Sequence, residues 1–220
     1  MKVYFILIAQ GLLLIAHSSL LKAKNMTEFL TKDYWNNRYE TEKTGWDLKA
    51  ISPPLKAYID QLTDKNLSIL IPGCGNGYEA EYLAKQGFQN VTMIDFAPIA
   101  VERMKEVLSD YQHINVICED FFTHAGAYDL ILEQTFFCAI NPSLRPKYVQ
   151  KMTELLKPSG TLAGLLFNIQ FPNNPPFGGN KEEYEKLFSE QFSINVLSPC
   201  YNSVKPRMNS ELFFKFSKKV

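Results

Sequence analysis

From Met26 onward, the hydrophobic residues of the chain follow two alternating patterns. Short apolar runs, typical of buried strands, are followed by segments whose apolar residues lie three or four positions apart, typical of helices that bury one face. No internal repeat or low-complexity tract interrupts the alternation. The pattern predicts an α/β fold with a largely parallel sheet.

Proline and glycine mark several ends of the predicted elements, with Pro98 in the first turn of the second helix and Gly87 after the first. The predicted strands are residues 67–71, 90–95, 115–118, 128–132 and 161–167, and the predicted helices are residues 79–86, 98–108, 147–156 and 182–188. Residues 192–197 and 212–217 are expected to form an antiparallel pair at one edge. Residues 171–179, rich in proline, asparagine and glycine, are expected to be a loop.

The first 25 residues differ from the rest. Lys2 precedes an apolar run from Val3 to Ala16, which is shorter than the roughly 20 residues needed to span a bilayer. Three interpretations stay open: a signal peptide, an anchor, or a segment upstream of a true start at Met26. We therefore divide the chain into a leader, residues 1–25, and one domain, residues 26–220. A cytoplasmic location is expected, with export or membrane association as the alternative if the leader is a targeting signal.

The composition points to a small-molecule site. The 220 residues include 23 Lys+Arg and 23 Asp+Glu, so the formal net charge is zero. Affinity for nucleic acid comes largely from neutralised phosphates, so a nucleic-acid partner is not expected. No membrane partner is expected beyond the leader, and we expect a monomer. The four cysteines show neither C-x-x-C pairing nor metal-ligand spacing, which argues against a metal site.

A glycine-rich turn follows the first predicted strand. Gly73, Gly75 and Gly77 lie there, where a backbone without Cβ atoms can approach a ligand closely. Asp95 ends the next strand about 20 positions later, where a carboxylate can accept hydrogen bonds from ribose hydroxyls. The two features together predict an adenosine-containing cofactor.

The glycine spacing also indicates the type of cofactor. The dinucleotide fingerprint G-x-G-x-x-G requires a third glycine at position 78, which is Tyr78. No phosphate-binding G-x-x-x-x-G-K-[ST] motif is present. The sequence therefore favours a cofactor without a pyrophosphate, and a nicotinamide-dependent oxidoreductase is the less favoured alternative.

Two further predicted strands end in residues suited to the same ligand. After the third strand, Asp120 can accept a hydrogen bond from an adenine amino group and Phe121 can cover a ring face. Gln134 follows the fourth strand. Because ligands of open parallel sheets bind outside the carboxyl ends of the strands, we expect Gly73, Asp95, Asp120 and Gln134 to line one pocket.

Several segments resemble one enzyme family. They are Ile71-Pro72-Gly73-Cys74-Gly75-Asn76-Gly77, residues 128–140, residues 155–160 and an aromatic stretch at 35–47. Together they resemble the class I S-adenosylmethionine-dependent methyltransferases, and within them the thiopurine S-methyltransferase group, which includes thiol and halide methyltransferases. The resemblance covers nearly all of residues 34–218. It implies a Rossmann-like fold with a mostly parallel sheet, helices on both faces, an antiparallel edge hairpin, and S-adenosyl-L-methionine as the cofactor.

The resemblance also implies roles for aromatic residues near the N-terminus. Trp35, Tyr39 and Trp46 are expected to close over the cofactor, since aromatic faces can stabilise a sulfonium cation while excluding water. The expected cofactor-binding residues are thus Trp35, Tyr39, Trp46, Gly73, Gly75, Asp95, Asp120, Phe121 and Gln134. Gln134 departs from the family pattern, because plant halide-group members tend to carry an aromatic residue at this position.

The expected substrate pocket comes from the same resemblance and includes Phe137, Pro176, Phe177 and Arg207. Pro176 and Phe177 match a proline-aromatic loop over the substrate. Arg207 matches a basic position of the family, where it can attract an anionic nucleophile.

The expected reaction is transfer of the cofactor's methyl group to a small soft nucleophile (a thiol, sulfide, thiocyanate or halide) by in-line displacement. A thiol with a reference pKa of about 8.5 is partly ionised near neutral pH, so no general base is required and no catalytic residue is assigned. Two alternatives stay open: a thiopurine-like aromatic thiol S-methyltransferase and a non-catalytic protein that binds S-adenosylmethionine.

Overall fold

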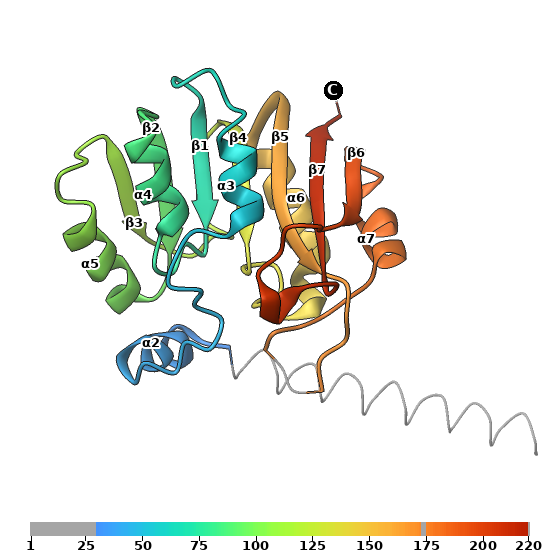
Figure 1. Ribbon diagram of the computed structural model, residues 1–220, viewed down its shortest axis with the longest axis horizontal. Coiled ribbons are helices and arrows are strands. Elements are labelled where there is room, and N and C mark those ends of the chain that lie inside the picture. Colours follow the sequence, from blue (N-terminus) through green and yellow to red (C-terminus); the bar gives the residue numbers. More distant parts are fainter. Residues whose placement is uncertain (1–29, 173–174, 220) are drawn as a thin grey trace, which may run out of the picture.

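The computed structural model describes residues 30–172 and 175–219. The leader, residues 1–25, lies outside the described residues, so its role stays a prediction. The strands are β1 (Ser68–Pro72), β2 (Asn90–Asp95), β3 (Ile114–Cys118), β4 (Tyr128–Gln134), β5 (Leu156–Phe167), β6 (Phe192–Pro199) and β7 (Glu211–Lys218). They form a seven-stranded sheet in the order β3-β2-β1-β4-β5-β7-β6 (Figure 1).

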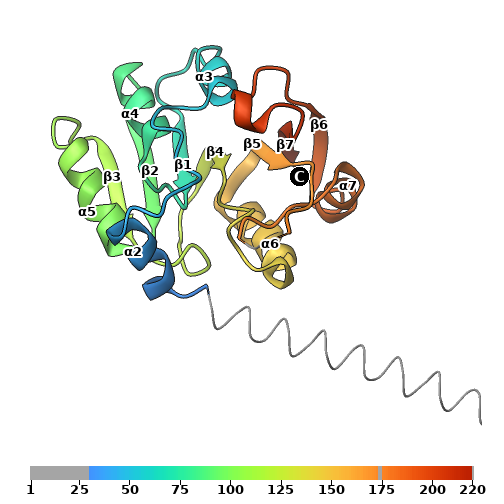
Figure 2. The ribbon, with the colours of Figure 1, turned by 60° about the horizontal axis from the view of Figure 1, so that its bottom comes forward.

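The sheet is parallel from β3 to β5, and β7 runs antiparallel between β5 and β6. The helices are α2 (Lys32–Glu40), α3 (Pro53–Ile59), α4 (Tyr78–Lys85), α5 (Pro98–Val107), α6 (Arg145–Leu155) and α7 (Lys181–Phe188). Single 3-10 turns lie at Pro142–Leu144 and Lys205–Arg207. Figure 2 shows α3 and α4 on the side of the sheet opposite to α6.

Two apolar clusters fill the spaces between the helices and the sheet. Residues of α3, α4 and α5 pack on one face with β1 and β2, and residues of α6 and α7 pack on the other with β5 and β7. The central strands are therefore covered on both sides. This explains why β1 reads as an unbroken apolar run, Ile69-Leu70-Ile71, without the alternation of a half-exposed strand.

The predicted α/β pattern and the antiparallel edge pair are confirmed. The helices α2 and α3 were not predicted from the sequence. A further difference lies at β5, which begins at Leu156 and not near Thr161. Residues 157–160 lie between the predicted helix, 147–156, and the predicted strand, 161–167. The structure extends the strand through them because β4 and β5 pair again beyond a register shift between Tyr128 and Leu130.

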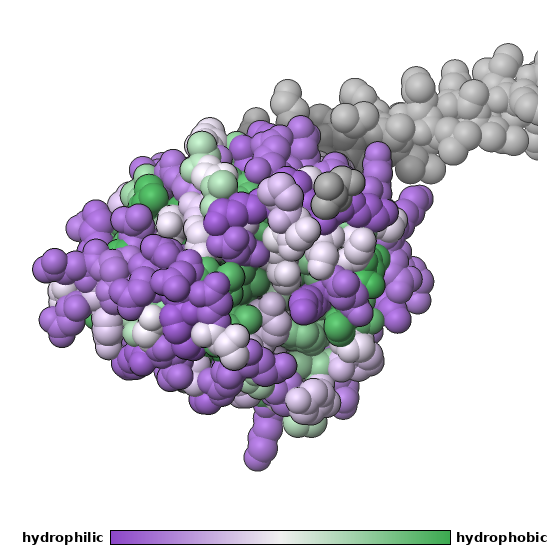
Figure 3. Space-filling model, turned by 90° about the horizontal axis from the view of Figure 1, so that it is seen from above, coloured by the Kyte–Doolittle hydropathy of each residue, from purple (hydrophilic) through white to green (hydrophobic). Residues whose placement is uncertain are grey.

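The carboxyl ends of the parallel strands meet at one end of the molecule. Figure 1 shows α2 beyond the tip of β1 at that end. The opposite end, seen from above in Figure 3, is mainly hydrophilic. In the part of the chain that the structure describes, no helix is both long and apolar enough to cross a membrane.

Gly164 of β5 lies against the backbone of β4. A Cβ atom at this position would lie 2.2 Å from the Glu133 carbonyl oxygen, an atom that cannot move without breaking the strand pair. We therefore expect Gly164→Ala to lower the free energy of unfolding by about 3 kcal/mol, as overpacking of a rigid site does. Urea denaturation would measure the change.

Gly45→Ala is the matched control, because a Cβ atom there meets nothing within 4 Å. We expect the urea midpoint of Gly45→Ala to stay close to that of the native protein. Equal stability of the two variants would contradict the close approach of β4 and β5 at Gly164.

Candidate active site

One large cavity opens at the carboxyl ends of the parallel strands. Its volume is about 830 Å³, and its walls come from α2 and the segment after it, the glycine turn, the ends of β2, β3 and β4, and residues near 167–171, 175–176 and 206–210. All nine residues expected to bind the cofactor line it: Trp35, Tyr39, Trp46, Gly73, Gly75, Asp95, Asp120, Phe121 and Gln134. The cavity thus joins residues separated by about 100 positions in the sequence.

The glycine turn has a left-handed backbone, with φ values of 57° at Gly73, 50° at Gly75 and 62° at Gly77. Side chains of other elements fill the space that Cβ atoms would need. A Cβ at Gly73 would lie 2.3 Å from the Phe136 ring, and one at Gly75 would lie 2.8 Å from the Tyr39 hydroxyl. Glycine is therefore required both by conformation and by the approach of these aromatic residues.

Asp95 connects the end of β2 to the glycine turn. Its side chain is 8% exposed; Oδ2 accepts the Gly75 amide hydrogen at 3.1 Å, and Oδ1 accepts that of Ala97 at 2.9 Å. Burial raises the pKa of the carboxyl group, while the amide donors oppose that shift. A carboxylate has about four acceptor positions, so acceptor capacity remains for ligand hydroxyls.

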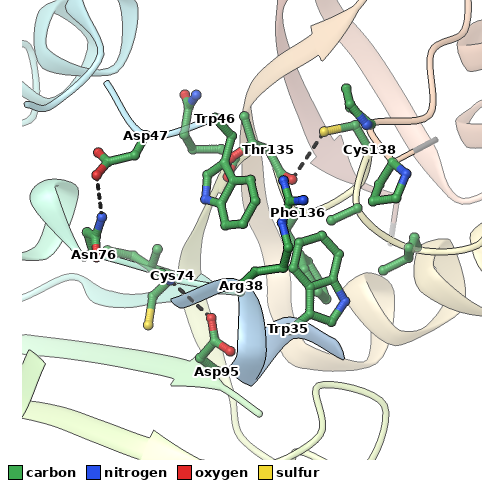
Figure 4. Close-up of a pocket in the computed structure, with 18 of the residues that line it drawn as sticks. Trp35, Arg38, Trp46, Asp47, Cys74, Asn76, Asp95, Thr135, Phe136 and Cys138 are labelled. Atoms are coloured by element: carbon green, nitrogen blue, oxygen red, sulfur yellow. Dashed lines mark hydrogen bonds between the residues drawn. The ribbon is translucent and has the colours of Figure 1, made fainter. Parts of the chain in front are cut away.

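Three aromatic side chains, Trp35, Tyr39 and Trp46, form one wall of the cavity. Figure 4 shows Trp35 and Trp46 in this wall. Trp46 packs edge to face on Trp35, with ring centroids 5.5 Å apart, and on Tyr39 at 5.8 Å. The Arg38 guanidinium lies over the Trp46 ring at 5.4 Å. Burial, and then Asp95, raise the pKa of the Tyr39 hydroxyl, which keeps it protonated.

Polar contacts attach the N-terminal segment to the sheet. The Asn76 side-chain amide of the glycine turn donates to Asp47 Oδ2 at 2.8 Å (Figure 4). The Ile99 amide at the start of α5 donates to Asn36 Oδ1 of α2 at 3.0 Å. The aromatic wall is thereby held beside the turn from two sides.

The end of β3 supplies a carboxylate and an aromatic ring. Asp120 Oδ1 accepts the Phe122 amide hydrogen at 2.9 Å, which fixes the turn after the strand. Phe121 is 4% exposed and packs edge to face on Phe136, with centroids 5.1 Å apart. Gln134, at the end of β4, accepts the Ser52 hydroxyl hydrogen through Oε1 at 3.1 Å.

Two of the residues expected in the substrate pocket lie elsewhere. Phe137 is 1% exposed and packs against Tyr148, Tyr184 and Phe188 in the core, and it does not line the cavity. Phe177 is also buried outside the cavity wall. The adjacent Phe136 lines the cavity instead, because Thr135, with φ of 60°, turns the chain between β4 and the two phenylalanines.

Pro176 and Arg207 line the cavity as expected from the sequence. The Arg207 guanidinium is already engaged: Nη2 donates to the Trp46 carbonyl oxygen at 2.6 Å, and Nη1 pairs with Glu211 at 3.4 Å. Both charged side chains of that pair are buried. Arg207 therefore also supports the aromatic wall, a role that the sequence did not indicate.

The comparisons with known proteins agree with this geometry. The sequence profile of the thiopurine S-methyltransferase family matches residues 30–219. A relative named "Probable thiol methyltransferase 2" from Arabidopsis thaliana is 36% identical over 159 residues, which are 70% of either chain. The chain belongs to the thiopurine S-methyltransferase family. It is accordingly an S-adenosylmethionine-dependent methyltransferase.

Other relatives carry the names of S-methyltransferases with different acceptors. "Thiocyanate methyltransferase 1" of Brassica oleracea is 30% identical over 171 residues, 75% of both chains. "Thiopurine S-methyltransferase" of Vibrio vulnificus is 24% identical over 209 residues, 86% of this chain and 95% of that one.

Among solved structures, the fold is similar to a Burkholderia thailandensis 1,6-didemethyltoxoflavin-N1-methyltransferase. The TM-score is 0.73 at 16% identity, over 89% of this chain and 90% of that chain. The likeness confirms the Rossmann-like methyltransferase fold.

Sequence reasoning missed several cavity residues of this family member. Arg38, Asp47, Asn76 and Cys138 all line the cavity. Among the described residues, Arg38 makes no ion pair, and its buried Nε has no hydrogen-bond partner. The short α2 helix gives no pattern that marks Arg38, apart from its position between Trp35 and Tyr39. Cys138 lies within the segment that resembles the family, but it is surrounded there by apolar residues, so the pattern does not mark it as a cavity residue.

We expect Asp95→Asn to weaken binding of S-adenosylhomocysteine by about 10- to 100-fold, because a hydrogen bond to a charged acceptor is worth about 1.5–3 kcal/mol. Isothermal titration calorimetry would measure the change. Asp110→Asn is the control, since Asp110 is exposed after α5 and does not line the cavity. Unchanged affinity in Asp95→Asn would contradict a role of Asp95 in cofactor binding.

Proposed function

We propose that this enzyme transfers a methyl group from S-adenosylmethionine to a small soft nucleophile: a thiol, sulfide, thiocyanate or halide. The observation that carries the proposal is the cavity wall, in which aromatic and proline side chains lie beside two arginines, Arg38 and Arg207. The thiol and thiocyanate methyltransferases among the relatives also support it.

The proposed chemistry is a direct displacement. The cofactor supplies an electrophilic methyl group on a cationic sulfur. A lone pair of the acceptor forms the new bond to the methyl carbon as the carbon–sulfur bond breaks, and the bonding electrons remain on the cofactor sulfur. Such a reaction depends on alignment and exclusion of water, which an aromatic wall supplies. No histidine among the described residues lines the cavity, and a preformed thiolate or anion needs no general base.

The cofactor roles follow from the positions of the lining residues. Asp95 would accept hydrogen bonds from the ribose hydroxyls, and Asp120 and Phe121 would contact the adenine. Trp35, Tyr39 and Trp46 would cover the sulfonium group. The backbone at Gly73 and Gly75 would lie against the cofactor, and Gln134 would contact it from the end of β4.

At the acceptor side, Arg38 and Arg207 would attract an anion, and Pro176 would form part of the apolar wall. Cys138 is a cavity thiol, but burial and the nearby Glu133 carboxylate raise its pKa to about 12. It therefore stays protonated at neutral pH and competes poorly with the acceptor for the methyl group.

An acceptor panel tests the proposed function. Purified protein is incubated with S-adenosylmethionine and, separately, with sulfide, thiocyanate, iodide, an aliphatic thiol or an aromatic thiol, and S-adenosylhomocysteine is measured. We expect turnover with at least one small nucleophile. Turnover with the aromatic thiol alone would favour the thiopurine-type alternative, and binding without any turnover would favour a non-catalytic protein.

Arg38 provides a test of anion attraction. We expect Arg38→Gln to raise KM for thiocyanate about 10-fold or more while leaving S-adenosylhomocysteine affinity within about twofold, because a charge-assisted hydrogen bond is lost only at the acceptor side. Initial rates over a range of thiocyanate concentrations would show this. Arg103→Gln on α5 is the control, since Arg103 is exposed and lies outside the cavity wall. A matching loss of S-adenosylhomocysteine affinity would assign Arg38 to the cofactor.

A further inference from the structure

Glu133 is a buried carboxylate immediately behind the cavity wall. Its side chain is fully buried near the end of β4 and does not line the cavity. Oε1 accepts the amide hydrogens of Phe136 at 2.8 Å and Phe137 at 2.9 Å, and Oε2 accepts the Tyr148 hydroxyl hydrogen of α6 at 2.7 Å. One carboxylate therefore connects the strand, the loop after it and a helix.

The loop that Glu133 holds has an unfavourable backbone. Thr135 has φ of 60°, a left-handed conformation that is rare for a β-branched residue and persists only where the surroundings impose it. The two amide hydrogen bonds to Glu133 close the loop across this residue. They set the position of Phe136, whose ring covers Gly73 of the cofactor turn and contacts Phe121.

Among the described residues Glu133 forms no ion pair, and the titratable groups that face it are the Tyr148 hydroxyl on α6 and the Cys138 thiol in the loop. The flanking strand β1 has no titratable side chain, and Lys157 of β5 pairs with Asp129 at the start of β4. Burial consequently raises the pKa of Glu133 to about 7, although its three donors oppose the shift.

We propose that Glu133 is a positioning residue that, as a carboxylate, holds the Phe136 wall against the glycine turn and makes cofactor affinity increase with pH across the neutral range. The inference rests on the cofactor cavity and does not depend on which acceptor is methylated. Protonation replaces an acceptor of hydrogen bonds by a weaker acceptor and an O–H donor. The loop is then held less firmly, and the cofactor binds less tightly.

Stability is expected to change in the opposite direction. The folded-state pKa of Glu133, about 7, is above the reference value of about 4.3, so the folded form binds the proton more tightly than the unfolded form. The contribution of Glu133 to stability is therefore greatest below the unfolded pKa and is lost as pH rises toward 7. A purely structural residue would change stability and affinity in the same direction.

Calorimetric titration of S-adenosylhomocysteine between pH 6 and 8.5 tests the inference. In the native protein we expect affinity to fall about fivefold from pH 8 to pH 6 with a midpoint near 7, as the loss of about 1 kcal/mol of hydrogen bonding predicts. In Glu133→Gln, the affinity for S-adenosylhomocysteine should no longer change around pH 7. The thermal stability of this variant at pH 8 should be no lower than that of the native protein. Glu182 is exposed on α7, so affinity in Glu182→Gln should depend on pH as it does in the native protein.

Tyr148→Phe provides a second test that does not depend on the folding of Glu133→Gln. The Tyr148 hydroxyl lowers the pKa of Glu133 by donating to it, so its removal should move the affinity midpoint to higher pH. An affinity of the native protein that does not change with pH, or the same profile in Glu133→Gln or Tyr148→Phe as in the native protein, would overturn the inference. Because the ligand is S-adenosylhomocysteine alone, failure of methyl transfer would leave this result unaffected.

Discussion

The cavity depends on the close approach of Phe136 to Gly73. The glycine turn can lie beneath an aromatic ring only because it has no Cβ atom, which would meet that ring at 2.3 Å. This contact joins the loop after β4 to the loop after β1, two neighbouring strands of the sheet. At Gly75 of the same turn, a Cβ atom would lie 2.8 Å from the Tyr39 hydroxyl oxygen. The glycines thus let two aromatic elements meet over one short segment of backbone.

Polar groups hold the approaching elements in place, and each has a second role. Asp95 binds the turn through the Gly75 amide and remains an acceptor for a ligand. Arg207 donates to the Trp46 carbonyl while its charge is balanced by Glu211. Both side chains support neighbouring elements and also line the cavity, so a single substitution here changes the shape of the cavity as well as its wall.

The buried acid Glu133 also holds a neighbouring element in place, the loop after β4. A buried carboxylate with no ion-pair partner among the described residues is costly, and here two backbone amides and one hydroxyl donate hydrogen bonds to it. Those donors belong to a loop whose backbone would not adopt its conformation unaided. The arrangement is consistent with a site where local strain and an unfavourable buried charge are retained because they fix a functional wall.

The sequence by itself determined the order of strands and helices from β1 onward, the glycine turn and the acidic end of β2, because these depend on spacing between near neighbours; it did not indicate α2 and α3. All nine residues that it predicted for the cofactor line the cavity. Only the tertiary structure decided that Phe136 and not Phe137 faces the cavity, that Arg207 forms an ion pair, and that Arg38 forms none with the described residues. Side chains in irregular loops are directed by contacts with distant segments, and a periodic pattern carries no information about those contacts.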